Sequence, residues 1–113
     1  MRARLAKWLA FGTVLLLLAL SVVFAARADD TAAAIERGKE VYRAAKCQAC
    51  HSIAGEGGKR SPLDGVGAKL TPDDIRKWIV APREMDPKVV KPSFDRLSSD
   101  DLAALVAYLV TLR

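Results

Sequence analysis

Side chains that perform catalysis or bind metals are scarce in this sequence. Its 113 residues include only two cysteines and one histidine. A structural zinc site takes four ligands, usually cysteine and histidine, so the chain is one donor short of such a site. The sequence also shows no second histidine, catalytic acid pair or nucleophile with a base beside it. We therefore expect the protein not to be an enzyme in its own right.

An excess of positive charge is also absent from most of the chain. The formal net charge is +5, but four of the 18 Lys and Arg residues lie before Asp29, which leaves 14 basic residues against 13 acidic ones. Nucleic acids and anionic membrane surfaces are bound by clustered basic side chains. We therefore expect no nucleic-acid partner and no strong steering toward other partners by net charge.

The N-terminal segment has the pattern of an export signal. Three basic residues among the first seven precede residues 8–26, which carry no charge and are mostly Leu, Val, Ala and Phe. Ala26 and Ala28 are small residues at the two positions that a signal peptidase recognises before its cleavage site. We therefore expect a signal peptide at 1–28 and a folded domain at 29–113. The alternative is an uncleaved N-terminal membrane anchor, because the 19 uncharged residues nearly suffice to span a bilayer. Either way, the folded domain is expected in the periplasm or at the outer face of the cytoplasmic membrane.

The two cysteines and the histidine stand together as Cys47-Gln48-Ala49-Cys50-His51. A thioredoxin-like pair expects alternating strands and helices, which this sequence lacks, whereas a plain disulfide is an alternative in an oxidising compartment. Two thiols at this spacing reach the two vinyl groups of one porphyrin, and the adjacent imidazole binds its iron. We therefore predict one covalent haem c, attached through Cys47 and Cys50, with His51 as the proximal iron ligand. A domain of about 85 residues also needs such a cofactor to supplement its small core.

The rest of the chain reads as helices joined by loops rich in glycine and proline. Capping residues and apolar spacing predict helices from Asp30 or Thr31 to about Lys46, from Thr71 to Pro82, and from Ser98 to the chain end. The segments 52–70 and 81–97 are expected as loops, the first of them wrapping the haem. With no alternating strand pattern, the predicted fold is all-α, with three main helices around one haem after an N-terminal export or anchor segment.

A set of residues spread over positions 31–113 matches a known family. The set comprises Gly38-Lys39, Tyr42, the Cys47–His51 motif, the loop from Pro62 to Gly67, Trp78-Ile79, Pro82 and Leu105-Val106-Ala107-Tyr108-Leu109. Together these residues resemble the class I, mono-haem cytochrome c family. The resemblance implies that the first and last helices cross at Gly38 and Tyr108, with Tyr42 packed nearby.

The resemblance also implies a partner for the proximal histidine. In the family, the backbone carbonyl of a loop proline accepts a hydrogen bond from the imidazole N–H of that histidine, on the nitrogen that does not bind iron. This hydrogen bond fixes the orientation of the ring. Pro62 is the matching residue, although Ser61-Pro62-Leu63-Asp64-Gly65 departs from the commoner Gly-Pro-x-Leu-x-Gly. The indole N–H of Trp78 is a second candidate contact, to a haem propionate, with simple core packing as the alternative.

The distal iron ligand is where the sequence departs most from the family. Relatives use the methionine of a Met-Pro dipeptide, and this register places Lys91 there, 40 residues beyond His51. Met85, six residues earlier, has the better chemistry, because its sulfur is neutral and soft, whereas Lys91 must lose a proton of pKa about 10.4. Burial can lower that pKa. Met85 is therefore the first candidate, Lys91 the alternative, and an open distal site the third possibility.

These features predict an electron-transfer function. We expect a one-electron carrier whose partners are redox proteins at the outer face of the membrane, either free or as the haem subunit of a larger oxidoreductase. The alternative is a five-coordinate haem protein that binds a small gas ligand or has weak peroxidase activity. Its support is the displaced methionine alone.

The two fates of the N-terminal segment differ in mass. Cleavage should leave Asp29 as the first residue of protein isolated from its native host, because the Ala26-Arg27-Ala28 site directly precedes it. Mass spectrometry of intact protein from soluble and membrane fractions will test this. An uncut N-terminus in the membrane fraction would establish the anchor instead.

Overall fold

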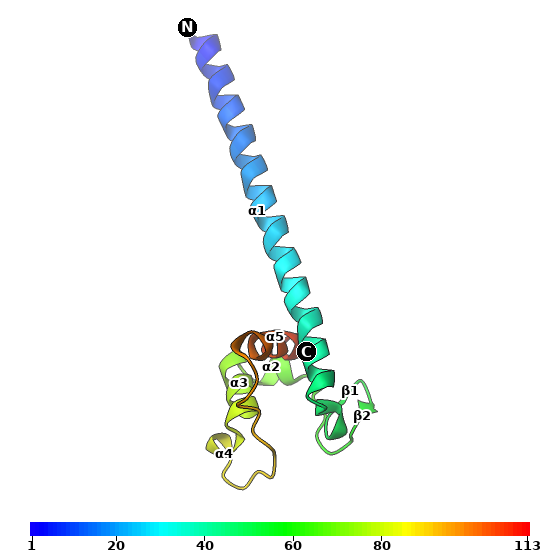
Figure 1. The fold of residues 1–113 in the computed structure, drawn as a ribbon. Coiled ribbons are helices and arrows are strands. Elements are labelled where there is room, and N and C mark those ends of the chain that lie inside the picture. The colour runs from blue at the N-terminus through cyan, green and yellow to red at the C-terminus, as the bar shows by residue number, and fades with distance from the viewer. The chain divides into compact units, whose positions relative to one another are not determined.

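A computed structural model describes the backbone of residues 1–113 and all side chains except those of residues 2–7, 9 and 10. The chain divides into two compact units, residues 1–32 and 33–113, here called unit 1 and unit 2. Along the chain the elements are α1 (Arg2–Ala44), η1 (Cys47–Ala49), β1 (Ser52–Ile53), β2 (Glu56–Gly57), α2 (Val66–Lys69), α3 (Pro72–Val80), α4 (Pro82–Met85) and α5 (Ser99–Val110) (Figure 1).

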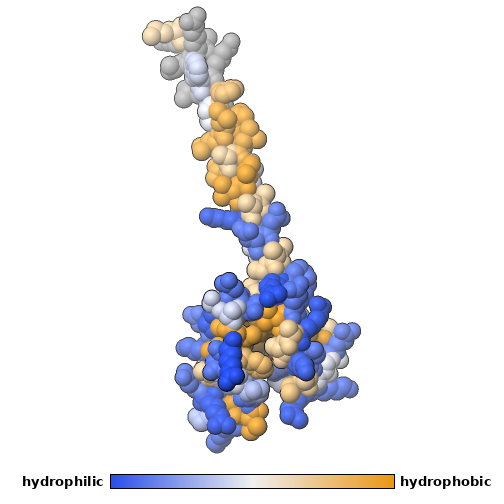
Figure 2. Space-filling view, viewed as in Figure 1, coloured by the Kyte–Doolittle hydropathy of each residue, from blue (hydrophilic) through white to orange (hydrophobic). Residues whose placement is uncertain are grey.

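Unit 1 is helical and exposes apolar side chains. Leu16 is 64% and Phe24 is 80% exposed, and Figure 2 shows apolar residues gathered along this part of α1. By length and composition, α1 could cross a membrane, although a signal sequence at the N-terminus meets the same criteria. An apolar surface of this size is unfavourable in water, so the segment calls for a lipid environment or for removal.

The predicted start of the first helix is wrong. A helix was expected to begin at Asp30 or Thr31, but α1 runs without a break from Arg2 to Ala44. The Thr31 hydroxyl donates to the Arg27 carbonyl at 2.9 Å, a bond made inside a helix rather than at a cap. At the other end, Lys46 has a left-handed backbone, with φ 57°, so the helix stops two residues before the expected end.

The core of unit 2 forms where α1, α3 and α5 meet. Its buried members are Val41, Tyr42, Ile75, Ile79, Leu105, Val106 and Leu109. Full burial of side chains of this size stabilises a fold by about 1.5–3 kcal/mol each. All of them lie on the faces that the helical spacing of the sequence marked as apolar.

Two helices of unit 2 cross in close backbone contact. A Cβ atom on Gly38 would lie 2.1 Å from the Ala104 carbonyl oxygen and 2.6 Å from the Cβ of Tyr108. The rings of Tyr42 and Tyr108 meet edge to face beside this contact, with centroids 6.0 Å apart. The crossing expected at Gly38 and Tyr108, with Tyr42 nearby, is confirmed.

Local capping explains the starts of α3 and α5. The Thr71 hydroxyl accepts from the Asp74 backbone N–H at 3.1 Å, and the Asp74 carboxylate accepts in return, which completes a capping box. Ser98 caps α5 by accepting from the Asp101 N–H at 3.1 Å. Both starts are as predicted.

The two predicted loops contain more structure than expected. Between residues 52 and 70, β1 and β2 pair antiparallel and α2 follows. Ala54 and Gly55 both have positive φ, as a tight two-residue hairpin turn requires. After α3, Pro82 occupies the first position of α4 instead of only ending a helix. The fold is helix-rich as predicted, with one short hairpin inside a segment expected as loop.

The crossing at Gly38 sets two effects of opposite sign against each other. Alanine is a better helix former than glycine by about 1 kcal/mol, so propensity alone would make Gly38→Ala stabilising. The added methyl group would collide with the α5 backbone, and overpacking of this kind costs about 1–3 kcal/mol or more. We expect the collision to dominate, lowering the free energy of unfolding of the haem-loaded protein in chemical denaturation.

A matched variant controls for general effects of substitution on α1. Arg43 is exposed on the same helix, so Arg43→Ala should change the free energy of unfolding by no more than about 0.5 kcal/mol. A Gly38→Ala protein more stable than the parent would show that α1 and α5 do not need this close approach.

Candidate haem site

The two cysteines lie on a short helix with three residues per turn. After the left-handed Lys46, η1 covers Cys47–Ala49, and the backbone N–H groups of Cys50 and His51 both donate to the Cys47 carbonyl, at 3.2 and 3.0 Å. Side chains three positions apart eclipse one another in such a turn. Cys50 directly follows η1, about one turn after Cys47, and both residues are free thiols.

The His51 ring is oriented by a backbone carbonyl. Its Nδ1 lies 2.8 Å from the carbonyl oxygen of Ser61. A carbonyl can only accept, so Nδ1 carries the proton and donates, which leaves Nε2 as the nitrogen with a free lone pair. A second carbonyl contact holds the backbone of the same residue, because the Tyr42 hydroxyl donates to the His51 carbonyl at 3.3 Å. Burial, with smaller contributions from Cys47 and Tyr108, raises the pKa of Tyr42 to about 12, so this hydroxyl keeps its proton.

The predicted role of Pro62 is wrong by one position. The carbonyl that reaches His51 belongs to Ser61. In the family pattern the proline stands two residues before the leucine, and two residues before Leu63 is Ser61. Pro62 acts instead on its neighbour, since a proline disfavours the helical conformation of the residue before it.

Two glycines allow the hairpin loop to pack against the cysteine motif. A Cβ atom on Gly57 would lie 2.4 Å from the His51 carbonyl oxygen, and one on Gly58 would lie 2.5 Å from that of Ala49. The Gly58 N–H donates to the Gln48 carbonyl at 2.8 Å. The segment that carries Ser61 is thus fixed to the motif through the backbone.

Lys91 extends from the loop between α4 and α5 into a half-buried position. Its Nζ donates to the Trp78 carbonyl at 2.6 Å and lies 5.4 Å from the centroid of the Phe94 ring. The same loop is tied to the end of α3 by a bond from the Phe94 N–H to the Ile79 carbonyl, at 3.0 Å. Lysine is normally a surface residue whose ammonium group stays in water.

Lys91 and Cys47 interact electrostatically. Burial raises the pKa of the Cys47 thiol, while the charge of Lys91 opposes that rise. Burial lowers the pKa of Lys91, against a smaller opposite effect from Cys47. Each group is therefore among the influences on the pKa of the other.

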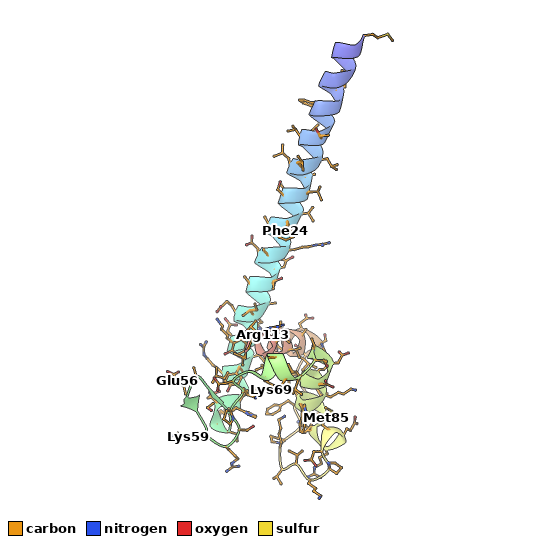
Figure 3. All side chains as sticks on the ribbon, turned by 180° about the vertical axis from the view of Figure 1, so that it is seen from behind. Phe24, Glu56, Lys59, Lys69, Met85 and Arg113 are labelled. Carbon is orange, nitrogen blue, oxygen red and sulfur yellow. The ribbon has the colours of Figure 1, made fainter. Side chains whose placement is uncertain are left out.

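Met85, the other predicted distal ligand, is the last residue of α4 and is half-buried. Figure 3 shows it across unit 2 from Glu56 and Lys59, which lie in and just after the hairpin. Trp78 is also half-buried on α3. Iron binding by Met85 and a propionate contact by Trp78 both stay predictions.

The donor set fits a broad apolar cofactor better than a lone ion. Among the described side chains, no three of His, Cys, Asp and Glu converge closely enough to hold a metal ion. Apolar side chains around the core are left only partly buried, including Ile53, Leu63, Leu70, Phe94 and Leu97. In Figure 2 the surface of unit 2 is notched between the region of α4 and that of the hairpin. Two closely spaced free thiols, an oriented imidazole and unfilled apolar surface suit a haem.

Similarity to known proteins agrees with this chemistry. The chain is 25% identical over 95 aligned residues to cytochrome c oxidase subunit 2 of Alkalihalophilus pseudofirmus, an alignment that covers 75% of this chain and 28% of that protein. The chain therefore spans little more than a quarter of the length of this relative. The family model described as cytochrome c matches residues 35–113. Since this match covers unit 2 almost from end to end, the chain belongs to the cytochrome c family.

Proposed function

We propose that this protein carries one haem c, covalently bound through Cys47 and Cys50, and passes single electrons at the outer face of the cytoplasmic membrane. The observation that supports this most directly is the geometry of residues 47–51. The two free thiols stand at the start of η1 and directly after it, and the next residue is a histidine whose Nδ1 donates to the Ser61 carbonyl.

Each residue of the site has a distinct task in this proposal. A bound haem supplies an iron couple that gains or loses one electron. Cys47 and Cys50 hold the porphyrin through thioether bonds, and His51 offers Nε2 as the proximal ligand. The Ser61 carbonyl strengthens that ligand by accepting a hydrogen bond from its Nδ1–H, which also prevents the ring from rotating.

The N-terminal segment supports the proposed position of the protein in the cell. The exposed apolar helix of unit 1 and the basic residues before it support export, with the segment serving as a cleaved signal or as an anchor. The relative is a subunit of cytochrome c oxidase. This similarity supports a membrane-bound oxidase as the redox partner. The protein would act either as a separate electron carrier to that oxidase or as one of its haem subunits.

The alternative of a five-coordinate, gas-binding haem or a weak peroxidase rested on the displaced methionine. Neither the family match nor the similarity to an oxidase subunit favours it. We therefore propose electron transfer alone.

The covalent attachment can be tested residue by residue. Cys47→Ser and Cys50→Ser should each severely reduce haem staining on denaturing gels, because each thiol makes one of the two attachments. Gln48→Ala is a matched control, since Gln48 is exposed between the two cysteines and should keep full staining. Undiminished staining in both serine variants would refute covalent attachment.

The number of electrons can be measured directly on the haem-loaded protein. A spectroscopic redox titration should be reversible and should follow a one-electron curve, with a slope of about 59 mV per tenfold change in the ratio of oxidised to reduced protein. A slope near half that value would indicate a two-electron process and would contradict a single-electron carrier.

A further inference from the structure

The loop before α5 turns a charged residue inward and an apolar residue outward. Val90 is 96% exposed, whereas its neighbour Lys91 is half-buried. Burying a long charged side chain while exposing a valine is opposite to the usual preference and costs free energy. An arrangement of this kind calls for a function of the buried amine.

Within the described part of the chain, the contacts of Lys91 involve a carbonyl and an aromatic ring and no carboxylate. Its nitrogen donates one hydrogen bond, to the Trp78 carbonyl at 2.6 Å, and the Phe94 ring covers it on another side. Among the described side chains, no carboxylate forms a salt bridge with Lys91; the ion pairs found there belong to Arg37 and Lys39. Once the ammonium group loses a proton, the amine can still donate to the Trp78 carbonyl and has a lone pair for another partner.

Lys91 and His51 are each held by a hydrogen bond to a backbone carbonyl. The Ser61 carbonyl positions the imidazole and the Trp78 carbonyl positions the amine, each through one short bond to a nitrogen. In metal sites of proteins, a ligand is typically oriented by a hydrogen bond to a neighbouring group that does not itself bind the metal. The two residues come from different segments of unit 2, because His51 follows η1 next to the hairpin whereas Lys91 lies in the loop between α4 and α5, and Figure 1 shows these two regions apart.

We propose that Lys91, rather than Met85, supplies the distal iron ligand, so that the haem is bound between two nitrogen donors. This inference rests on the proposed function, since it needs a haem attached at Cys47 and Cys50. An amine favours ferric iron more than a thioether does, so Lys91 sets a lower reduction potential than a methionine would at the same position.

The experiment compares ferric absorption and electron paramagnetic resonance spectra of haem-loaded variants. The parent should be low-spin and should lack the weak sulfur-to-iron band at the red end of the visible spectrum. Lys91→Ala should become high-spin. Lys91→Met should stay low-spin, gain the sulfur band and show a higher midpoint potential.

Two further variants separate ligation from a structural role. Arginine keeps the charge and the hydrogen-bond donors of lysine but has no lone pair for a metal. Lys91→Arg should therefore retain parental thermal stability and still become high-spin. Lys88→Ala, at an exposed lysine of the same loop, should leave the spectra unchanged.

Several outcomes would overturn the proposal. A sulfur-to-iron band in the parent spectrum that disappears in Met85→Leu would assign the distal ligand to Met85. This outcome can be observed even if none of the Lys91 variants folds. A high-spin parent would mean an open distal site. A low-spin Lys91→Arg protein identical to the parent would reduce Lys91 to a structural role. In all three cases haem staining through Cys47 and Cys50 would be retained, so covalent attachment would stand, and the redox titration tests electron transfer separately. A loss of staining is expected only if attachment itself fails.

Discussion

The backbone contact between α1 and α5 at Gly38 is the constraint on which the rest of unit 2 depends. It fixes the end of α1, and η1 follows three residues later with both thiols. The last residue of α5 packs against α2 at Gly67, where a Cβ atom would lie 2.1 Å from the Val110 carbonyl oxygen. The Arg37–Asp101 ion pair spans the same crossing at 2.8 Å, but Arg37 is 56% exposed, so the pair adds little.

Backbone carbonyls do much of the positioning around the site. Carbonyl oxygens of Ser61, Trp78 and His51 accept from an imidazole, an amine and a phenol, respectively. A carbonyl cannot change its protonation state in the accessible pH range, so it holds a partner without adding a charge that would compete for the metal. Positioning by backbone carbonyls suits a small domain, because it needs no additional side chains to orient the residues of the site.

Features with local causes could be predicted from the sequence. The start of α3 follows from Thr71, Pro72 and Asp74 alone, and the start of α5 follows from Ser98 and Asp101, because a cap is complete within one turn of helix. The crossing at Gly38 was accessible through the family resemblance. The haem attachment site could be predicted from the spacing of its two cysteines and its histidine alone.

Features that depend on distant backbone could not be predicted. Strands of two residues are too short to show an alternating pattern, so β1 and β2 were read as loop. The partner of His51 was assigned to Pro62 because the sequence shows residue types, whereas the contact is made by a carbonyl that every residue has. Only the packing of α3 against the loop shows that Lys91 points inward, since its neighbours in sequence are Val90 and Pro92.

The unbroken α1 also bears on maturation of the chain. Before any cleavage, Asp29, Asp30 and Thr31 are interior helix positions, and the Thr31 hydroxyl donates to the Arg27 carbonyl. Cleavage after Ala28 would remove that carbonyl and expose the first N–H groups of a shorter helix directly beside two carboxylates, which stabilise a positive helix end. The precursor and the processed protein would then use the same three residues in two ways, first as part of a continuous helix and later as its newly created beginning.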